Sequence, residues 1–118
     1  MIKDFRDLVV WQNGIEIVDE VYRVTKEFPK AEMYGLISQF RRAAISVPSN
    51  IAEGHGRSGK NEYLHHLSIA HGSLMECLTL AVISNRQEFI AKEPADNLII
   101  QIEALSRKIR TLMLKLKK

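Results

Sequence analysis

The first candidate for chemistry is the glycine-rich stretch Gly54–Lys60, which reads GHGRSGK. Its glycines match the G-x-G-x-x-G spacing of dinucleotide-binding loops. The same residues match G-x-x-x-x-G-K, although Asn61 stands where a phosphate-binding loop has Ser or Thr to hold magnesium. Both motifs need a strand before the loop and a parallel sheet around it. A helical pattern precedes this loop and no strand pattern occurs anywhere, so we expect no nucleotide site.

The next candidates are a pair of possible metal ligands and a single thiol. Glu62 and His65 have the Glu-x-x-His spacing of di-iron helical bundles, but such sites need a second copy of the motif, which is missing. His65 falls on the polar side of its helix, and His71 on the apolar side, where a hydrogen-bonded core histidine is expected. Cys77 falls in an apolar stripe and should be an inert buried thiol. We expect no metal, no cofactor and no enzymatic activity, although sequence order alone does not exclude a Ser-His-acid triad.

Positive charge is concentrated in parts of the chain. Residues 107–118 hold six basic residues and no acidic one, whereas the other 106 residues hold 11 basic and 14 acidic residues, for an overall net charge of +3. Basic clusters attract phosphates. Cations at the end of a helix are equally expected because they stabilise the negative end of its dipole. The candidate nucleic-acid-binding residues are Arg41, Arg42, Arg57, Lys60, Arg107, Lys108, Arg110 and Lys115. For Arg41, at the edge of an apolar arc, an ion pair or packing along apolar surface is the alternative.

Four amphipathic helices must position these residues. Hydrophobic periodicity predicts helices over about 7–27, 35–53 and 61–85, and a fourth that has Pro94 in its first turn. Short connections favour an all-α, antiparallel up-down four-helix bundle. The second and fourth helices then run in the same direction. We therefore expect the basic residues that follow the second helix and those that end the fourth to share one end of the bundle.

The first helix is predicted to need partners on two sides. Its apolar residues form two adjacent stripes that together span roughly 200°, more than the about 100° that one core-facing stripe needs. The first stripe is Leu8, Trp11, Ile15, Val18 and Tyr22, and the second is Val10, Gly14, Ile17, Val21 and Val24. We assign the second stripe, together with Ile69 and Leu80 of the third helix, to a subunit interface. Gly72 on the third helix favours close approach of another backbone.

Pro48 interrupts the second helix. It has no N–H to donate and crowds the carbonyl of Ala44, so it should bend the helix. Ser46, Ser49 and Asn50 are short polar side chains that could take up the freed carbonyl. A bend with a local packing cause is one explanation. A bend that shapes a subunit contact is the other.

Composition limits the class of protein. At 118 residues the chain should fold as one domain, 1–118, with a core of its own. A single cysteine fits a reducing compartment. The N-terminal MIKDFRD lacks the apolar run of a signal peptide, and no stretch approaches the roughly 18 apolar residues of a membrane helix. We expect a cytoplasmic protein.

Three segments carry a family resemblance: FRDLVVWQNGIEIVDEVYRVTKEFP (5–29), YGLISQFRRAAISVPSNIAEGHGR (34–57) and EYLHHLSIAHGSLMEC (62–77). They cover about two-thirds of the chain and resemble the bacterial family named for open reading frames in 23S rRNA intervening sequences; SVPSNIAEGHGR is the most specific run. The resemblance implies an antiparallel four-helix bundle that assembles as a barrel-shaped pentamer. A relative, the accessory variability protein of diversity-generating retroelements, is thought to bind nucleic acid and a reverse transcriptase. The resemblance supplies no catalytic residues.

Two functions follow from these expectations. The first is a non-enzymatic homo-oligomer that binds RNA or DNA through a basic surface at a helix end. The second is a protein-interaction module or scaffold, for example a partner of a reverse transcriptase, that binds no nucleic acid itself. Binding that depends on salt would separate the two, because phosphate contacts release counterions.

Overall fold

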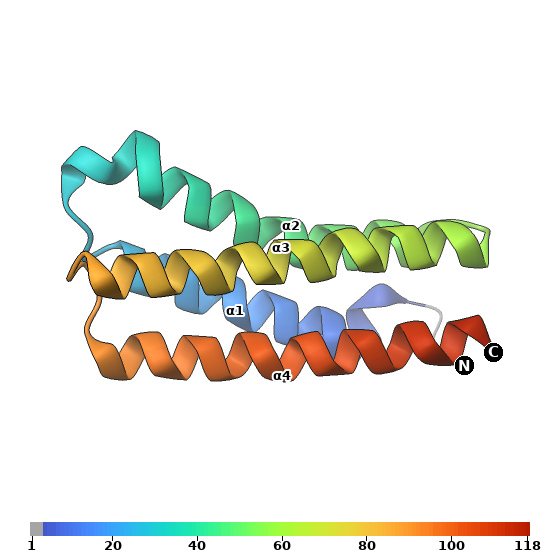
Figure 1. Cartoon of the computed structure of the whole chain (residues 1–118). Helices are drawn as coiled ribbons and strands as arrows, with labels where there is room; N and C mark the ends of the chain where they lie inside the picture. The colour runs from blue at the N-terminus through green and yellow to red at the C-terminus, as the bar shows by residue number, and fades with distance from the viewer. Residues whose placement is uncertain (1–3) are drawn as a thin grey trace.

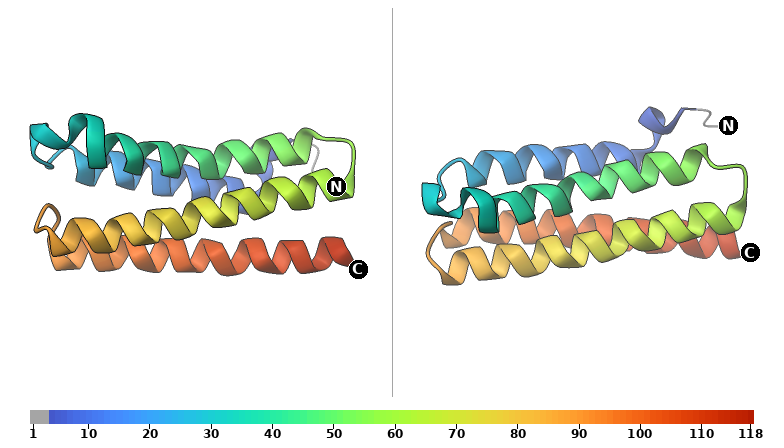
Figure 2. Two further views of the ribbon diagram at one scale, coloured as in Figure 1. Left: turned by 45° about the horizontal axis from the view of Figure 1, so that its top comes forward. Right: turned by 90° about the horizontal axis from the view of Figure 1, so that it is seen from above.

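Apolar side chains from four long helices meet in one shared core. A computed structural model describes residues 4–118; residues 1–3, which open the predicted 1–118 domain, lie outside the described residues. The helices are α1 (Val9–Thr25), α2 (Ser38–Gly56), α3 (Lys60–Arg86) and α4 (Lys92–Lys117), and residues 4–118 contain no strand. Figures 1 and 2 show them running alternately up and down along one axis. The predicted all-α, antiparallel up-down four-helix bundle is confirmed.

The helices pack in a ring of four neighbours. α2 packs between α1 and α3, and α4 closes the bundle against α3 and α1. Fully buried Phe40, Leu74, Leu98 and Ile102 mark the centre of the core, from three different helices. The bundle is elongated, with principal extents of 44 × 23 × 20 Å. α2 and α4 therefore end at the same end of the molecule, as predicted.

The first helix begins later than predicted. Asp4 caps a short 3₁₀ turn, Phe5–Asp7, by accepting a hydrogen bond from the Arg6 backbone N–H at 2.8 Å. α1 itself starts at Val9 and ends at Thr25, whose hydroxyl donates to the Val21 carbonyl at 2.7 Å. The aromatic ring of Phe5 lies edge-on to Trp11, with 5.3 Å between ring centroids. The 3₁₀ turn thus folds back over the first turns of α1.

The start of α2 stands away from the bundle. A 3₁₀ turn, Lys30–Glu32, leads into a π-helical turn, Met33–Ile37, in which Gly35 departs from helical geometry. The predicted second helix, from about residue 35 to 53, is therefore shifted to Ser38–Gly56. In Figure 1 the first half of α2 rises away from α3, and the second half lies along it. The bend opens the space between α2 and α3 at this end.

Pro48 has a packing partner on the neighbouring helix. It is buried within α2, and Gly14 of α1 faces it so closely that an added Cβ at Gly14 would lie 3.3 Å from the Pro48 Cβ. The Asn50 amide donates to the Ser46 carbonyl at 2.9 Å, and not to the carbonyl of Ala44 as the sequence suggested. The missing side chain of Gly14 therefore accommodates the proline ring inside one chain.

A Schellman motif ends α3. The Phe89 N–H donates to the Ser84 carbonyl and the Glu88 N–H to the Asn85 carbonyl, both at 2.9 Å. Glu88 has a positive φ of 64°, which glycine adopts more easily. α4 then starts at Lys92, two residues before the predicted Pro94, which keeps its place in the first turn. Phe89 packs against Phe28 and ties this turn to the end of α1.

By length and composition alone, α3 is the one described helix that is long and apolar enough to cross a membrane, whereas the sequence was expected to hold no such stretch. Its apolar residues lie on several faces because it contacts α2, α4 and the core, and Glu76 is its one charged residue between Glu62 and Arg86. The core helix of a soluble bundle passes the same test.

Candidate functional site

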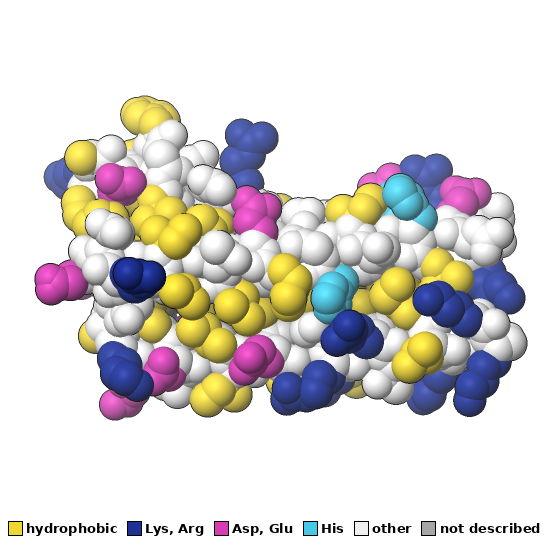
Figure 3. All heavy atoms as spheres, viewed as in Figure 1, with side chains coloured by type: hydrophobic (Ala, Val, Ile, Leu, Met, Phe, Trp, Pro, Cys, Tyr) yellow, Lys and Arg dark blue, Asp and Glu magenta, His cyan; other side chains and the backbone are white. Residues whose placement is uncertain are grey.

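Basic side chains gather at the end of the bundle where α4 terminates. Figure 3 shows lysine and arginine side chains concentrated over this end, which Figure 1 identifies as the C-terminal end of α4. All six basic side chains of residues 107–118 are exposed, and five have no hydrogen-bond or ion-pair partner among the described residues: Arg107, Arg110, Lys115, Lys117 and Lys118. Lys108 differs, because its Nζ donates to Asn13 Oδ1 of α1 at 2.9 Å. We call Arg107–Lys118 together with the α2–α3 turn the basic end.

The α2–α3 turn contributes less unpaired positive charge than the sequence suggested. Arg57 donates to Glu53 Oε2 at 2.7 Å and lies 3.7 Å from Glu62 Oε2. The hydrogen bond from Arg57, with His66 nearby, lowers the pKa of Glu53, which stays ionised beside the arginine. Lys60 is exposed as the first residue of α3. Arg57 and Lys60 do share an end with α4, but the charge of Arg57 is largely balanced by two carboxylates.

Arg41 and Arg42 lie elsewhere, which corrects their grouping with Arg57. Sixteen residues separate Arg41 from Arg57 along α2, or roughly 24 Å at 1.5 Å per residue. The Arg41 guanidinium lies over the Tyr22 ring, 4.4 Å from its centroid, and its Nε donates to Thr25 Oγ1 at 2.9 Å. It therefore packs against α1 and forms no ion pair among the described residues. Arg42 is exposed and lines a groove between α2 and α3.

The α2–α3 groove was not predicted from the sequence. It has a volume of about 450 Å³ and is open to solvent. Its polar lining includes Ser38, Gln39, Arg42, Ser46, Ser73 and Glu76. The Gln39 amide donates to Glu76 at 3.2 Å, and Ser73 donates to Ser46 at 2.9 Å. These two hydrogen bonds join α2 to α3 across the groove.

A hydrogen-bonded chain continues from the groove toward the basic end. The Asn50 amide donates to Ser46 Oγ at 3.0 Å, and its Oδ1 lies 3.0 Å from His66 Nδ1. His66 Nε2 in turn lies 3.9 Å from Glu53, which holds Arg57. Because its hydrogen bonds run along α2 or join α2 to α3, this network fixes the register of the two helices. No buried side-chain N or O of residues 4–118 lacks a hydrogen-bond partner.

The predicted subunit interface is wrong for six of its seven residues. Val10, Gly14, Ile17, Val21 and Val24 of α1 and Leu80 of α3 are buried inside the single chain. Ile69 remains exposed, at 39%. The inward face of α1 is the stripe that contains Gly14, because the glycine lets Pro48 pack closely. Gly72 has no other part of the chain within 4 Å of an added Cβ, so no backbone approaches it within the monomer.

The other stripe of α1 faces outward, beside α2. It lines an apolar groove of about 280 Å³ that we call the α1–α2 groove, formed by Trp11, Ile15, Val18, Ile45, Pro48 and Ala52. Ile45, in the middle of α2, is 42% exposed. Apolar surface gathered in this way marks interaction sites on soluble proteins.

Comparison with known proteins places the chain in a family. The model of the 23S rRNA-intervening sequence protein family matches residues 6–111. The chain belongs to this family. No curated protein matches the chain. A crystal structure of a protein with unknown function from the S23 ribosomal protein family of Bacteroides thetaiotaomicron VPI-5482 has the same fold, with a TM-score of 0.83, 17% sequence identity, and 89% of this chain and 98% of that chain covered.

Potentially reactive side chains of this 23S rRNA-intervening sequence protein are dispersed or buried. Among residues 4–118, no three His, Cys, Asp or Glu side chains lie close enough to hold a metal ion. Burial, with Glu76 beside it, raises the pKa of the Cys77 thiol to about 12. His71 Nε2 lies 2.8 Å from Ser106 Oγ, which makes it the hydrogen-bonded histidine that the sequence suggested. Burial and the nearby Arg110 lower its pKa.

Helical spacing is the only sign in the sequence of the polar residues that line the α2–α3 groove, and this sign is weak. Ser46 and Asn50 are spaced i, i+4 on α2, and His66 and Ser73 are seven residues apart on α3. Each pair therefore lies on one side of its helix. Their partners are 16 and 27 residues away in the chain, and only the register between the helices brings them together.

Proposed function

We propose that this protein is a non-enzymatic, cytoplasmic homo-oligomer that binds nucleic acid through the basic end. The observation that carries the proposal is the surface of the last three turns of α4, where six exposed cations stand without a carboxylate between residues 107 and 118. Lys60 adds a cation from the turn that shares this end. The family description, which names the 23S rRNA intervening sequence, is in keeping with a nucleic-acid role.

Binding of this kind would be to the phosphate backbone. Lysine and arginine on a helix surface neutralise phosphates and release their counterions, which supplies affinity without sequence specificity. The C-termini of α2 and α4 meet at this end, and the negative ends of their dipoles also favour cations there.

Repetition in an oligomer would strengthen weak contacts at each basic end. Linked weak sites gain affinity because the second contact is intramolecular once the first has formed. The apolar α1–α2 groove supports self-association, since an isolated chain would leave its hydrophobic lining in water.

The test is a salt titration of binding to single- and double-stranded RNA and DNA. Arg110→Glu with Lys117→Glu should weaken binding to every sequence and lower the slope of log K against log salt by about one per lost phosphate contact. The matched control, Lys26→Glu with Arg86→Glu, changes two exposed cations and therefore changes the charge equally at the opposite end of the bundle. Absence of binding at low salt, or equal effects of both double variants, would contradict the proposal.

A second candidate is a protein-interaction module that binds no nucleic acid. The α1–α2 groove favours it, because an apolar groove suits a protein partner better than a phosphate backbone. Under this alternative, binding to nucleic acid is absent at low salt, and Ile45→Glu abolishes association with protein without affecting the fold.

A further inference from the structure

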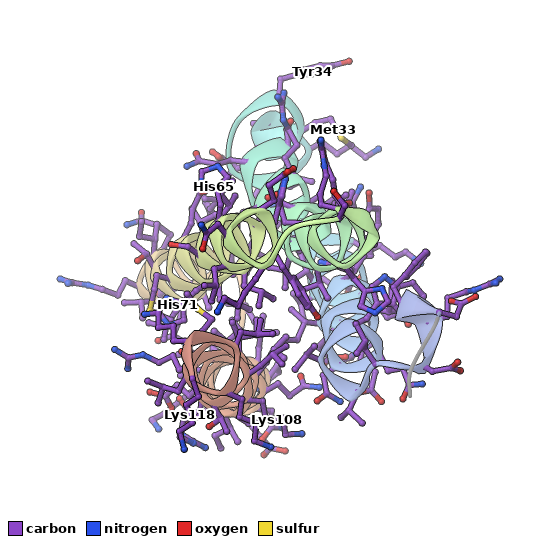
Figure 4. All side chains as sticks on the ribbon, turned by 90° about the vertical axis from the view of Figure 1, so that its right-hand side faces the viewer. Met33, Tyr34, His65, His71, Lys108 and Lys118 are labelled. Atoms are coloured by element: carbon purple, nitrogen blue, oxygen red, sulfur yellow. The ribbon has the colours of Figure 1, made fainter. Side chains whose placement is uncertain are left out.

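A protruding pair of apolar side chains stands near one end of the α1–α2 groove. Met33 is 45% exposed and Tyr34 is 96% exposed, in the π-helical turn that opens α2. Figure 4 shows both side chains directed away from the bundle, with Tyr34 at its outermost point. We call them the Met33–Tyr34 knob.

The knob is held by a structured turn. Ile37, which ends the turn, is buried in the core. The Glu32 carboxylate accepts a hydrogen bond from the Leu36 N–H at 3.4 Å, across the residues of the knob. An exposed aromatic side chain on a fixed turn contributes binding area at little cost in conformational entropy.

The groove is complementary to such a knob in polarity. The six side chains that line it carry no charge, and Ser49 places one hydroxyl at its edge. A tyrosine ring can bury its faces in an apolar groove while its hydroxyl keeps a polar neighbour. The knob thus offers protruding apolar side chains and the groove offers an apolar recess, and the two surfaces lie on different parts of the same chain.

The surrounding charges are also complementary. On α1, Asp19 is exposed and follows the groove-lining Val18, whereas Glu16 lines the side that faces α4 and Glu20 is paired with Arg23. Arg42 lines the same surface as Met33 and Tyr34, and Lys30 and Glu32 precede the knob in the chain. Opposite net charges of one unit would therefore lie near each other if the knob of one chain met the groove of another, which favours the correct pairing.

We propose that the Met33–Tyr34 knob of one copy docks in the α1–α2 groove of the next copy. This inference rests on the proposed homo-oligomer and names its contact surfaces. Because knob and groove are different surfaces, the contact is heterologous, and repeating it gives a closed ring or an open filament. A chain does not fill the far end of its own groove, since Ala52 lies 14 residues beyond Ser38, the first residue of α2, or roughly 21 Å at 1.5 Å per residue, and Tyr34 lies before Ser38.

The test is thiol crosslinking between copies. The double variant Met33→Cys with Ala52→Cys places one thiol in the knob, next to Tyr34, and one in the groove, too far apart within a chain for a short bismaleimide. Native Cys77 should not react with the bismaleimide, because its thiol is buried and burial raises its pKa to about 12. The expected result is a ladder of covalent multimers that ends at the ring size, whereas each single variant gives no ladder.

A matched control uses the opposite side of the molecule. Ile100 on α4 is 61% exposed, so Met33→Cys with Ile100→Cys offers an equally accessible second thiol that the proposed contact does not approach. No ladder from the knob–groove pair, or equal ladders from both pairs, would overturn the proposal.

Complementation between two damaged copies provides a second measurement. Tyr34→Ser removes the knob and Ile45→Glu places a charge in the groove, and each variant alone should remain monomeric in light scattering. An equimolar mixture should form heterodimers through the one intact knob and the one intact groove; a mixture that stays monomeric would contradict the docking. A wild-type protein that is monomeric at micromolar concentration would contradict the proposed homo-oligomer as well. A wild-type oligomer that forms no crosslinks would contradict the proposed knob–groove interface alone.

Discussion

Charge at single residues depends on the immediate neighbours. Arg57 was a candidate phosphate ligand, but Glu53 and Glu62 flank it, so an approaching phosphate would have to compete with two carboxylates. Arg110 and Lys117 have no such partner among the described residues and are better candidates. His71 illustrates the same dependence for a titrating group, because burial and Arg110 both disfavour its charged form.

Stability should fall with acidification because of His71. Its pKa is lowered in the folded protein, so below the ordinary value of 6.5 the unfolded chain binds a proton that the folded chain does not. The free energy of unfolding should therefore be highest above that pH and decrease as pH falls toward the folded pKa. His71→Gln should show a shallower decrease in urea denaturation between pH 7.5 and 5.5. Equal pH dependence in both proteins would contradict this.

Replacing Glu88 with glycine should stabilise the folded protein. Its φ of 64° lies in the left-handed region, which costs a side-chain-bearing residue roughly 1 kcal/mol relative to glycine. Glu88→Gly keeps both backbone hydrogen bonds of the motif that ends α3, and should raise the unfolding free energy by about that amount. Glu93→Gly, within the first turn of α4, is the control and should lower it. Destabilisation by Glu88→Gly would show that the side chain matters more than the backbone geometry.

At the scale of elements, the bend of α2 links the core to the surface. Pro48 packs against Gly14 inside the bundle, and the first half of α2 stands away from α3 on the other side of the bend. That separation opens the α2–α3 groove and raises the Met33–Tyr34 knob. The local packing cause and the effect on surface shape are therefore two aspects of one contact.

Replacing Pro48 should change assembly more than helicity. Pro48→Ala restores a backbone donor within α2 and removes ring atoms from the contact with Gly14. Helical content by circular dichroism should be equal or higher, while light scattering should show a weaker oligomer because the knob changes position. Gly72→Ala is the control: it fills open space on α3, should stabilise the helix by about 1 kcal/mol, and should leave assembly intact. An unchanged oligomer in Pro48→Ala would show that the bend is incidental to assembly.

The elements were easier to predict than their rotation. Hydrophobic periodicity and short connections were enough to predict the four helices, their antiparallel order and the common end at which α2 and α4 finish. The two stripes of α1 are adjacent and equally apolar, so periodicity could not tell which one faces inward; the contact between Gly14 and Pro48 decides it. The turn before α2 was missed because its residues continue a helical pattern through Gly35. The α2–α3 groove depends on register between helices, which a single sequence does not contain.

At the scale of the whole molecule, different surfaces have different properties. Basic residues occupy one end, the α1–α2 groove lies along one side, and the knob stands at the opposite end from the α4 terminus (Figures 1 and 4). Assembly through the knob and the groove would leave the basic end free, so identical basic ends could be displayed together. The proposed assembly and the proposed binding therefore do not compete for surface.

Breaking the oligomer should weaken nucleic-acid binding. Ile45→Glu lies far from the basic end, yet it should reduce apparent affinity for long RNA or DNA by about a hundredfold, since linked sites typically gain that much or more. The slope of log K against log salt should fall as well, because fewer phosphates are contacted by one particle. Ile100→Glu, with the same added charge on α4, should do neither. Equal affinities for wild type and Ile45→Glu would mean that each chain binds alone.

The described chain starts and finishes at the same end of the bundle, which is also the end of the α2–α3 turn (Figures 1 and 2). A short flexible linker could therefore join the two ends, and new ends could be opened in the turn between α3 and α4, at residues 87–91. Such a circular permutant would keep all four helices while tethering the last turn of α4 at both sides. It would also move affinity tags to the far end of the molecule, where they cannot screen the cations that are expected to meet phosphates.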